Sequence, residues 1–313
     1  MHIVVNLPDA DASPWLDLFH AELPNARILL RTPGQPADPA AVQGDYVIAA
    51  CPCDTLFDEQ KAPKAVFTIS AGVGHVLRLA NAPRHVPLIR IEDAGMAPQM
   101  VRYTLAVAFR VLQRLDVYAR QQRDAHWQQH DPRQPAEFAV GVLGLGVIGA
   151  GIARALAAQE FAVRGFARTP KYLPGIRCFA GAAQCDAFLD GLDMLVCVVP
   201  PTVETQGILN RRTLARLARG AHVVNLGRGA ALVDDDLLAL LDSGQLAGAT
   251  LDVFGEEPLP SAHPFWRRPD ITVTPHMAGL TLPRATVAQI AGKIARLERG
   301  ETVTGVVDYQ RGY

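Results

Sequence analysis

The chain is 313 residues long, 49% hydrophobic and 19% charged, and its 30 Lys and Arg residues face 31 Asp and Glu residues for a net charge of −1. This length suits one large or two medium domains, and the composition excludes a disordered chain. The charges are balanced, without the excess of basic residues that is typical of proteins that bind nucleic acids or membrane surfaces, so neither partner is expected.

Apolar runs and cysteine usage predict a cytoplasmic location. The longest apolar run, residues 194–199, is far shorter than the ~20 residues that cross a bilayer. The opening MHIVVNLPDADAS has no basic flank and too short an apolar stretch for a signal peptide. The five cysteines are odd in number and irregularly spaced, which is typical of a reducing compartment.

Short β-rich runs alternate with helix-length segments in the first part of the chain. This alternation is typical of βαβ units and a mostly parallel sheet. Pro and Gly cluster in residues 32–44, so we expect that stretch to be irregular. The predicted strands are residues 2–7, 26–30, 45–49, 65–70 and 87–91.

One long helix is predicted over residues 97–124, where Leu105, Phe109, Leu112 and Leu115 recur near helical spacing. A polar, proline-containing connector follows. A second βα series then begins, with helices over residues 149–159 and 234–244, and a last helix starts at about residue 283. Together the two series predict two α/β domains. The strands of the second series are residues 138–144, 161–167, 193–199, 222–227, 249–254 and 271–275.

A glycine-rich turn joins the first strand and helix of the second series. It fits G-x-G-x-x-G, in which the glycines allow a tight turn, backbone approach to a pyrophosphate and close helix packing. The pattern alone is weak and also fits a structural βα turn, but the strand–turn–helix context favours a dinucleotide site. Its residues are Gly144, Leu145, Gly146, Val147, Ile148 and Gly149.

The end of the next strand indicates which dinucleotide is bound. NAD sites usually carry an acid there for the ribose 2′-OH, whereas this chain has Arg168, Thr169 and Lys171. Arg168 would hold a 2′-phosphate, with the other two as helpers, so NADP(H) is favoured over NAD(H). The alternative is a solvated basic turn.

Three chemically active side chains follow three strands of the second series. Ligands of open parallel sheets bind beyond the carboxyl ends of the strands. Arg228 follows HVVN, Glu257 follows the strand at residue 249, and His276 follows ITVT. We therefore expect them on the same edge as the phosphate turn.

These side chains suit reduction of a 2-keto acid, which needs a hydride at C2 and a proton on the carbonyl oxygen. Arg228 would hold that oxygen and the neighbouring carboxylate. His276 would donate the proton, while Glu257 would favour the imidazolium and fix its tautomer. Each residue alone fits a solvated loop, so the joint placement carries the prediction. Histidines predicted to be surface or structural residues are His2, His20, His85, His126 and His130.

The strings NLGRGA, LDVFGEEPLP and TPHMAG, with GLGVIG before them, resemble the D-isomer-specific 2-hydroxyacid dehydrogenase family over nearly the whole chain. Residues 92–100 and 70–74 and the terminal VTGVVDYQRGY resemble its glyoxylate/hydroxypyruvate reductase A group. The resemblance implies two Rossmann/flavodoxin-like domains. An NADP-binding domain, residues 98–282, would be inserted into a substrate domain, residues 1–97 plus 283–313. Homodimers are implied, through residues 98–136.

The resemblance also implies residue roles. Arg228, Glu257 and His276 match the catalytic arginine, glutamate and histidine, and Gly72 and Val73 match a loop whose N–H groups hold the substrate carboxylate. The residues implied to contact cofactor are Pro200, Thr205 and Asp252, the last at the nicotinamide amide.

Two positions depart from the family's pattern. Gly74 stands where an acid is common, and Ala50 stands where the reductase group tends to have an aromatic residue. Ala50 predicts a roomier pocket that accepts a longer 2-keto acid.

Other motifs are given structural interpretations. Cys51 and Cys53 form C-x-C without a second pair, so zinc is not expected. Residues 234–236 are three aspartates that read as a helix start. Trp127 and Trp266 are expected to pack at domain or subunit contacts.

The sequence thus predicts a cytoplasmic NADPH-dependent reductase of small 2-keto acids such as glyoxylate and hydroxypyruvate, without a metal. One alternative is a dehydrogenase for bulkier 2-keto acids or with NAD(H). A more remote one is a non-catalytic NADP(H)-sensing protein, which would need none of Arg228, Glu257 and His276.

Overall fold

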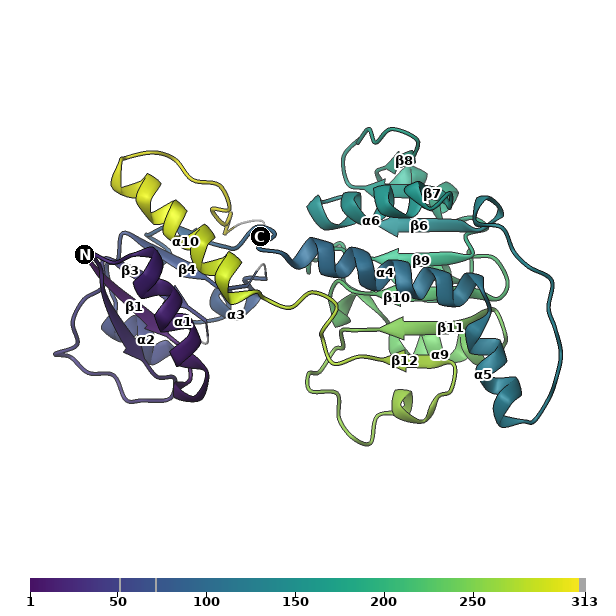
Figure 1. Ribbon diagram of the computed structural model, residues 1–313, viewed down its shortest axis with the longest axis horizontal. Helices are drawn as coiled ribbons and strands as arrows, with labels where there is room; N and C mark the ends of the chain where they lie inside the picture. The colour runs from purple at the N-terminus through teal and green to yellow at the C-terminus, as the bar shows by residue number, and fades with distance from the viewer. Residues whose placement is uncertain (51, 71, 310–313) are drawn as a thin grey trace. The chain divides into compact units, whose positions relative to one another are not determined.

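The computed structural model describes residues 1–50, 52–70 and 72–309, which form two compact units (Figure 1). One unit comprises Met1–Gly95 and Thr281–Tyr313, and the other comprises Met96–Leu280. Each unit has one sheet whose named strands all pair in parallel. The predicted fold class, two α/β domains with parallel sheets, is therefore confirmed.

The first unit is built on a five-stranded sheet with the order β2-β1-β3-β4-β5. Alternate residues of β1 face opposite cores: Ile3 and Val5 pack with helices α1 and α10, and Val4 packs with α2 and α3. Figure 1 shows α1 beside α10. Because helices cover both faces, the inner strands β3 and β4 are buried at every position. The bounds are β1 His2–Asn6, α1 Asp9–Glu22, β2 Arg27–Arg31, β3 Tyr46–Ala49, α2 Asp54–Glu59, β4 Ala65–Thr68, α3 Gly74–Leu77, β5 Leu88–Ile89 and α10 Pro283–Glu298.

The second unit is built on a seven-stranded sheet with the order β12-β11-β10-β9-β6-β7-β8. The order reverses between β6 and β9, which is where such sheets bind nucleotides. Its strands and longer helices are β6 Ala139–Leu143, α6 Val147–Ala158, β7 Ala162–Ala167, β8 Arg177–Ala180, β9 Met194–Cys197, β10 Ala221–Asn225, α9 Asp234–Asp242, β11 Leu246–Leu251 and β12 Ile271–Val273. The remaining helices are α4 Met96–Leu112, α5 Leu115–Arg123, α7 Cys185–Leu189 and α8 Arg211–Leu214, with short 3₁₀ turns at Pro135–Glu137, Ala182–Gln184, Gly229–Ala231 and Pro264–Arg267.

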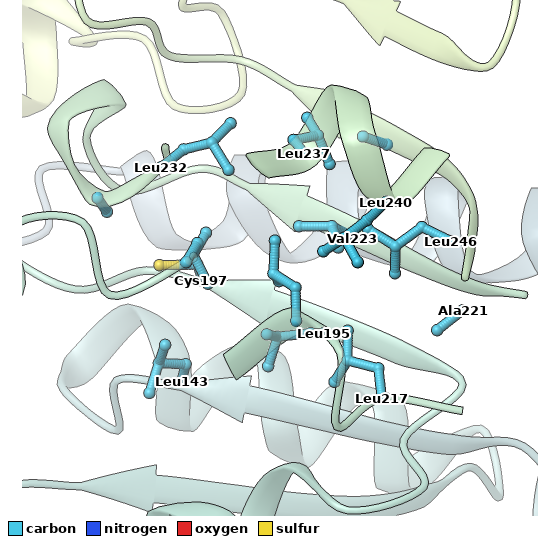
Figure 2. Packing of buried hydrophobic residues seen from close by; sticks show 14 of the residues in the cluster. Leu143, Leu195, Cys197, Leu217, Ala221, Val223, Leu232, Leu237, Leu240 and Leu246 are labelled. Atoms are coloured by element: carbon cyan, nitrogen blue, oxygen red, sulfur yellow. The ribbon is translucent and has the colours of Figure 1, made fainter. Parts of the chain in front are cut away.

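Hydrophobic side chains fill both sides of this sheet. In β9, Leu195 and Cys197 belong to the cluster that packs against α9, and Met194 and Val196 belong to the cluster that packs against α4 and α6. Figure 2 shows the first cluster in close view. This alternation of buried side chains is the signature of a strand covered on both faces, and it fixes the strand between two hydrophobic cores.

Some predicted elements differ from the structure. The helix predicted over residues 97–124 is wrong as one element, because Arg114 has a φ of +56° and divides α4 from α5. A left-handed residue cannot continue a right-handed helix. Strand β8 was not predicted, and the predicted strand at 87–91 is reduced to Leu88–Ile89. Residues 32–44 contain neither helix nor strand, as predicted.

Candidate active site

The glycine-rich turn lies between β6 and α6, at the point where the strand order reverses. Gly144 has a φ of +107°, and a Cβ on Gly149 would lie 1.8 Å from the Gly144 carbonyl oxygen, so both positions require glycine. A Cβ on Gly146, the N-cap of α6, would meet nothing within 4 Å. The protein thus leaves open space at a helix N-terminus, which fits the approach of a pyrophosphate.

The other residues of the turn have distinct surroundings. Leu145 is buried beneath Gly165, Val147 is exposed, and Ile148 is half-buried. Leu145 therefore anchors the turn to the sheet, and only its backbone is available to a ligand.

Basic residues follow the neighbouring strand β7. Arg168, Thr169 and Lys171 are all exposed just beyond its end. Hydrogen bonding by Thr202 lowers the pKa of Glu204, and the positive charge of Arg168 adds to that effect. The basic turn is therefore electrostatically linked to the loop after β9.

That loop is closed by Thr205. Its hydroxyl donates to the Pro200 carbonyl oxygen at 2.6 Å and accepts from the Thr202 N–H at 2.8 Å. Pro200 and Thr205, both expected at the cofactor, are thereby joined in one tight turn.

Arg228 stands on a loop shaped by the buried Asn225 at the end of β10. The Asn225 amide donates to the Arg228 carbonyl oxygen at 3.1 Å and accepts from the Gly227 N–H at 3.2 Å. The Arg228 guanidinium donates to the Gly227 carbonyl oxygen at 2.7 Å. Burial lowers the pKa of Arg228, and the negative charge of Glu257 opposes that shift. A half-buried cation thus lies within the field of Glu257.

Glu257 and His276 form a hydrogen-bonded pair. The Glu257 Oε2 lies 2.7 Å from His276 Nδ1, and its Oε1 accepts from the Phe254 N–H at 2.8 Å. The side chains remain 35% and 49% exposed. With Nδ1 directed to the carboxylate, Nε2 is the nitrogen left to exchange a proton with a ligand. The structure therefore pairs Glu257 with His276 and places Arg228 within the electrostatic reach of Glu257, and their catalytic roles stay predictions.

Comparison with known proteins supports the same interpretation. The family model "D-isomer specific 2-hydroxyacid dehydrogenase, NAD binding domain" matches residues 105–278. A protein of Serratia proteamaculans named glyoxylate/hydroxypyruvate reductase A is 45% identical over 320 residues, with both chains fully covered. The chain belongs to the D-isomer-specific 2-hydroxyacid dehydrogenase family.

Solved members of this oxidoreductase family share its fold. A dehydrogenase of Xanthobacter autotrophicus in complex with NADPH and MES superposes with a TM-score of 0.92 at 37% identity, covering 99% of each chain. An NADPH-dependent glyoxylate/hydroxypyruvate reductase of Sinorhizobium meliloti in complex with NADP and sulfate has a TM-score of 0.91 at 32% identity, covering all of both chains.

Asp252 is buried beneath the segment that carries His276. Its Oδ1 accepts from the Thr274 hydroxyl at 2.6 Å and the Met277 N–H at 2.9 Å, and its Oδ2 accepts from the Ala278 N–H at 2.9 Å. Membership of the family implies a nicotinamide contact for Asp252, and that role stays a prediction.

Sequence reasoning missed two residues near this carboxylate. Thr274 precedes His276 by two positions, and Tyr103 of α4 places its hydroxyl 2.7 Å from the Thr274 hydroxyl. Its place as the first residue of TPH, two positions before His276, was the available signal for Thr274. Nothing in the sequence pointed to Tyr103, because its contact spans 171 residues.

The expected carboxylate loop, Gly72 and Val73, belongs to the other unit. The Ser70 hydroxyl donates to the Gly72 carbonyl oxygen at 2.6 Å, and Val73 is buried as the N-cap of α3. Ala50 is half-buried just after β3. Their roles toward a substrate stay predictions.

The motifs interpreted as structural are placed as follows. Cys51 lies outside the described residues, and Cys53 is a free thiol. Asp234, Asp235 and Asp236 form the first turn of α9, as predicted. Within the described ranges, no three His, Cys, Asp or Glu side chains gather as metal ligands, and no helix there is long and apolar enough to cross a membrane.

Proposed function

We propose that this dehydrogenase reduces small 2-keto acids, such as glyoxylate and hydroxypyruvate, with NADPH. The observation that carries the proposal is the Glu257–His276 hydrogen bond within the field of Arg228. Carbonyl reduction needs a group that binds the carbonyl oxygen and a group that donates a proton, and the Arg228 guanidinium and the His276 imidazole can fill these two roles. A protein that only binds a nucleotide requires neither group. Relatives named glyoxylate/hydroxypyruvate reductase A support the substrate class.

The cofactor would be held by the second unit. Gly146 and the N-terminus of α6 would take the pyrophosphate, and Arg168, with Thr169 and Lys171, would take the 2′-phosphate. Bound NADPH supplies the hydride. The complexes of two relatives with NADPH and with NADP support the preference for the phosphorylated form.

The chain's own residues would orient the substrate and move one proton. Arg228 would hold the keto oxygen and the carboxylate, and His276 Nε2 would give its proton to the oxygen as the hydride reaches C2. The 2-hydroxy acid leaves, and solvent returns a proton to the imidazole. Glu257 keeps the ring oriented and compensates its positive charge.

The first unit would supply the substrate pocket. Gly72 and Val73 would offer backbone N–H groups to the substrate carboxylate. The domain roles would then be substrate binding for residues 1–97 plus 283–313 and NADP binding for residues 98–282. The small side chain of Ala50 favours a second candidate, a reductase of longer 2-keto acids.

His276→Gln tests the mechanism directly. General acid catalysis contributes typically ~10²–10⁴ in rate, so turnover is expected to fall by that order while NADPH binding, measured by fluorescence, stays unchanged. Glutamine retains a polar side chain of similar reach but cannot donate as an imidazolium. Retained turnover in this variant would remove His276 from the proton-donor role.

A homodimer is proposed for the enzyme. Helix α5 contributes no buried residue, Leu115 is 54% exposed, and Trp127 in the following connector is 98% exposed. Apolar side chains left in water along one continuous segment favour burial against a second copy. Sedimentation is expected to give twice the chain mass, and Trp127→Arg to weaken the dimer. A monomeric wild-type protein would contradict this assembly.

The cytoplasm is proposed as the location. Cys53, Cys178, Cys185 and Cys197 are free thiols among the described cysteines, which suits a reducing compartment. Cell fractionation with detection of the chain tests this, and recovery in an oxidising compartment would contradict it.

A further inference from the structure

Helix α4 contacts the segment that carries His276 at several points. The Tyr103 hydroxyl reaches Thr274 at 2.7 Å, and the Gln99 side chain donates to the Leu280 carbonyl oxygen at 2.9 Å. Between them, a Cβ on Gly279 would lie 2.8 Å from Met100 Cγ. Gln99 and Tyr103 are one helical turn apart and so share a face. One face of α4 thus contacts both ends of the His276 segment.

The direction of the hydrogen bonds can be derived. Asp252 accepts at both carboxylate oxygens, from two backbone N–H groups and from the Thr274 hydroxyl. A threonine hydroxyl has one proton, which Thr274 gives to Asp252, so Thr274 must accept from Tyr103. Burial raises the pKa of Tyr103, which keeps its hydroxyl a donor. The chain therefore runs from Tyr103 to Thr274 to Asp252.

His276 needs this support because its backbone is strained. Its φ is +52°, a left-handed conformation that costs a non-glycine residue free energy and persists where neighbouring contacts fix it. The N–H groups of Met277 and Ala278, which follow it directly, both end on Asp252. The conformation of His276 thus depends on the carboxylate that Thr274 and Tyr103 hold.

We propose that Tyr103 is a positioning residue for the proton donor, acting through Thr274 and Asp252 to hold His276 in its strained conformation. This inference rests on the proposed function for its kinetic consequence. Its structural consequence, the protection of two amide groups, does not depend on any substrate.

The test compares Tyr103→Phe with a matched control, Tyr46→Phe. Tyr46 is a buried tyrosine of the other unit whose hydroxyl donates to Glu298 at 2.7 Å, so the control also removes a tyrosine hydroxyl and its hydrogen bond, far along the chain from His276. Tyr103→Phe is expected to lower kcat about tenfold, which lies between the loss of one hydrogen bond and the ~10²-fold cost of a misplaced catalytic group. KM and NADPH affinity should change little, and Tyr46→Phe should leave all three unchanged.

Hydrogen exchange provides the second measurement. The amides of Met277 and Ala278 should exchange about tenfold faster in Tyr103→Phe, as expected when one hydrogen bond is removed, and at the wild-type rate in Tyr46→Phe. Thr274→Val should reproduce the effect, the double variant should add nothing further, and Thr274→Ser should restore protection because it keeps the hydroxyl.

Two outcomes would overturn the proposal. One is a Tyr103→Phe protein that matches Tyr46→Phe in both kcat and exchange. The other is faster exchange spread evenly over the second unit, which would assign the hydroxyl to general stability. If the wild-type protein reduces no 2-keto acid, the proposed function fails, and the exchange measurement alone still decides the role of Tyr103.

Discussion

An added methyl group should have different effects at two glycines of the phosphate turn: at Gly149 it should lower stability, and at Gly146 it should lower NADPH affinity. A Cβ on Gly149 would lie 1.8 Å from a backbone oxygen, about 1.6–2.2 Å inside ordinary van der Waals contact. Backbone cannot rotate away as a side chain can, so the turn must shift. Overpacking of this kind costs ~1–3 kcal/mol, which lowers the Tm of a domain of this size by roughly 2–12 °C.

Gly146→Ala should leave the fold nearly unchanged. The added Cβ meets nothing within 4 Å, and the φ of −73° suits alanine. Loss of the glycine N-cap should lower the free energy of unfolding by roughly 0.5 kcal/mol, and the reduced entropy of the unfolded chain should raise it by about the same amount. The methyl group would instead occupy the space proposed for the pyrophosphate. A lost hydrogen bond to a charged group is worth ~1.5–3 kcal/mol, so NADPH affinity should fall about 10–100-fold.

Thermal unfolding and fluorescence titration with NADPH, performed on both variants, separate the two effects. Gly149→Ala should lose stability, and Gly146→Ala should lose affinity at nearly wild-type Tm. Wild-type NADPH affinity in Gly146→Ala would refute the pyrophosphate assignment, and a wild-type Tm in Gly149→Ala would refute the packing argument.

Two further predictions concern charge. Arg168→Ala should weaken NADPH binding about 10–100-fold and leave NADH binding unchanged, because only NADPH carries the 2′-phosphate; equal losses for both cofactors in titrations would contradict this. His222 is buried with its Nε2 2.9 Å from the Thr250 hydroxyl, and burial, aided by the charge of Arg110, lowers its pKa to about 3. Between the unfolded value of ~6.5 and that folded value only the unfolded chain binds the proton, so stability should fall as pH falls, by about 2 kcal/mol at pH ~5. Denaturant titrations over this range should give His222→Gln a shallower dependence, and an equally steep one would exclude His222 as the cause.

The fold could be predicted where the sequence pattern is local. Runs such as residues 193–199 predict strands because both faces are buried, and the structure places Leu195 and Met194 in opposite cores. The break at Arg114 could not be predicted, since its neighbours Gln113 and Leu115 both continue the helical pattern. Strand β8 was missed because Arg177–Ala180 shows no apolar alternation and gains its strand form by pairing with β7.

In the candidate site, too, some features could be predicted from local sequence and others depend on tertiary contacts. Glu257 and His276 both follow strands, so the rule for strand ends in parallel sheets could predict that they lie close together, as their hydrogen bond shows. The packing of Asp252 under the His276 segment depends on contacts with Met277 and Ala278 that no spacing rule describes. The local sequence pattern therefore identified the candidate residues, whereas the contacts that hold the His276 segment in place are visible only in the structure.

Initial rates of NADPH and NADH oxidation with a panel of 2-keto acids test the proposed reductase activity. The panel should run from glyoxylate and hydroxypyruvate through pyruvate to phenylpyruvate. We expect rapid oxidation of NADPH with glyoxylate or hydroxypyruvate and much slower oxidation of NADH. Preference for phenylpyruvate would mean that Ala50 opens the pocket, and equal use of NADH would contradict the role of Arg168. No turnover with any acid would contradict the proposed reduction of 2-keto acids.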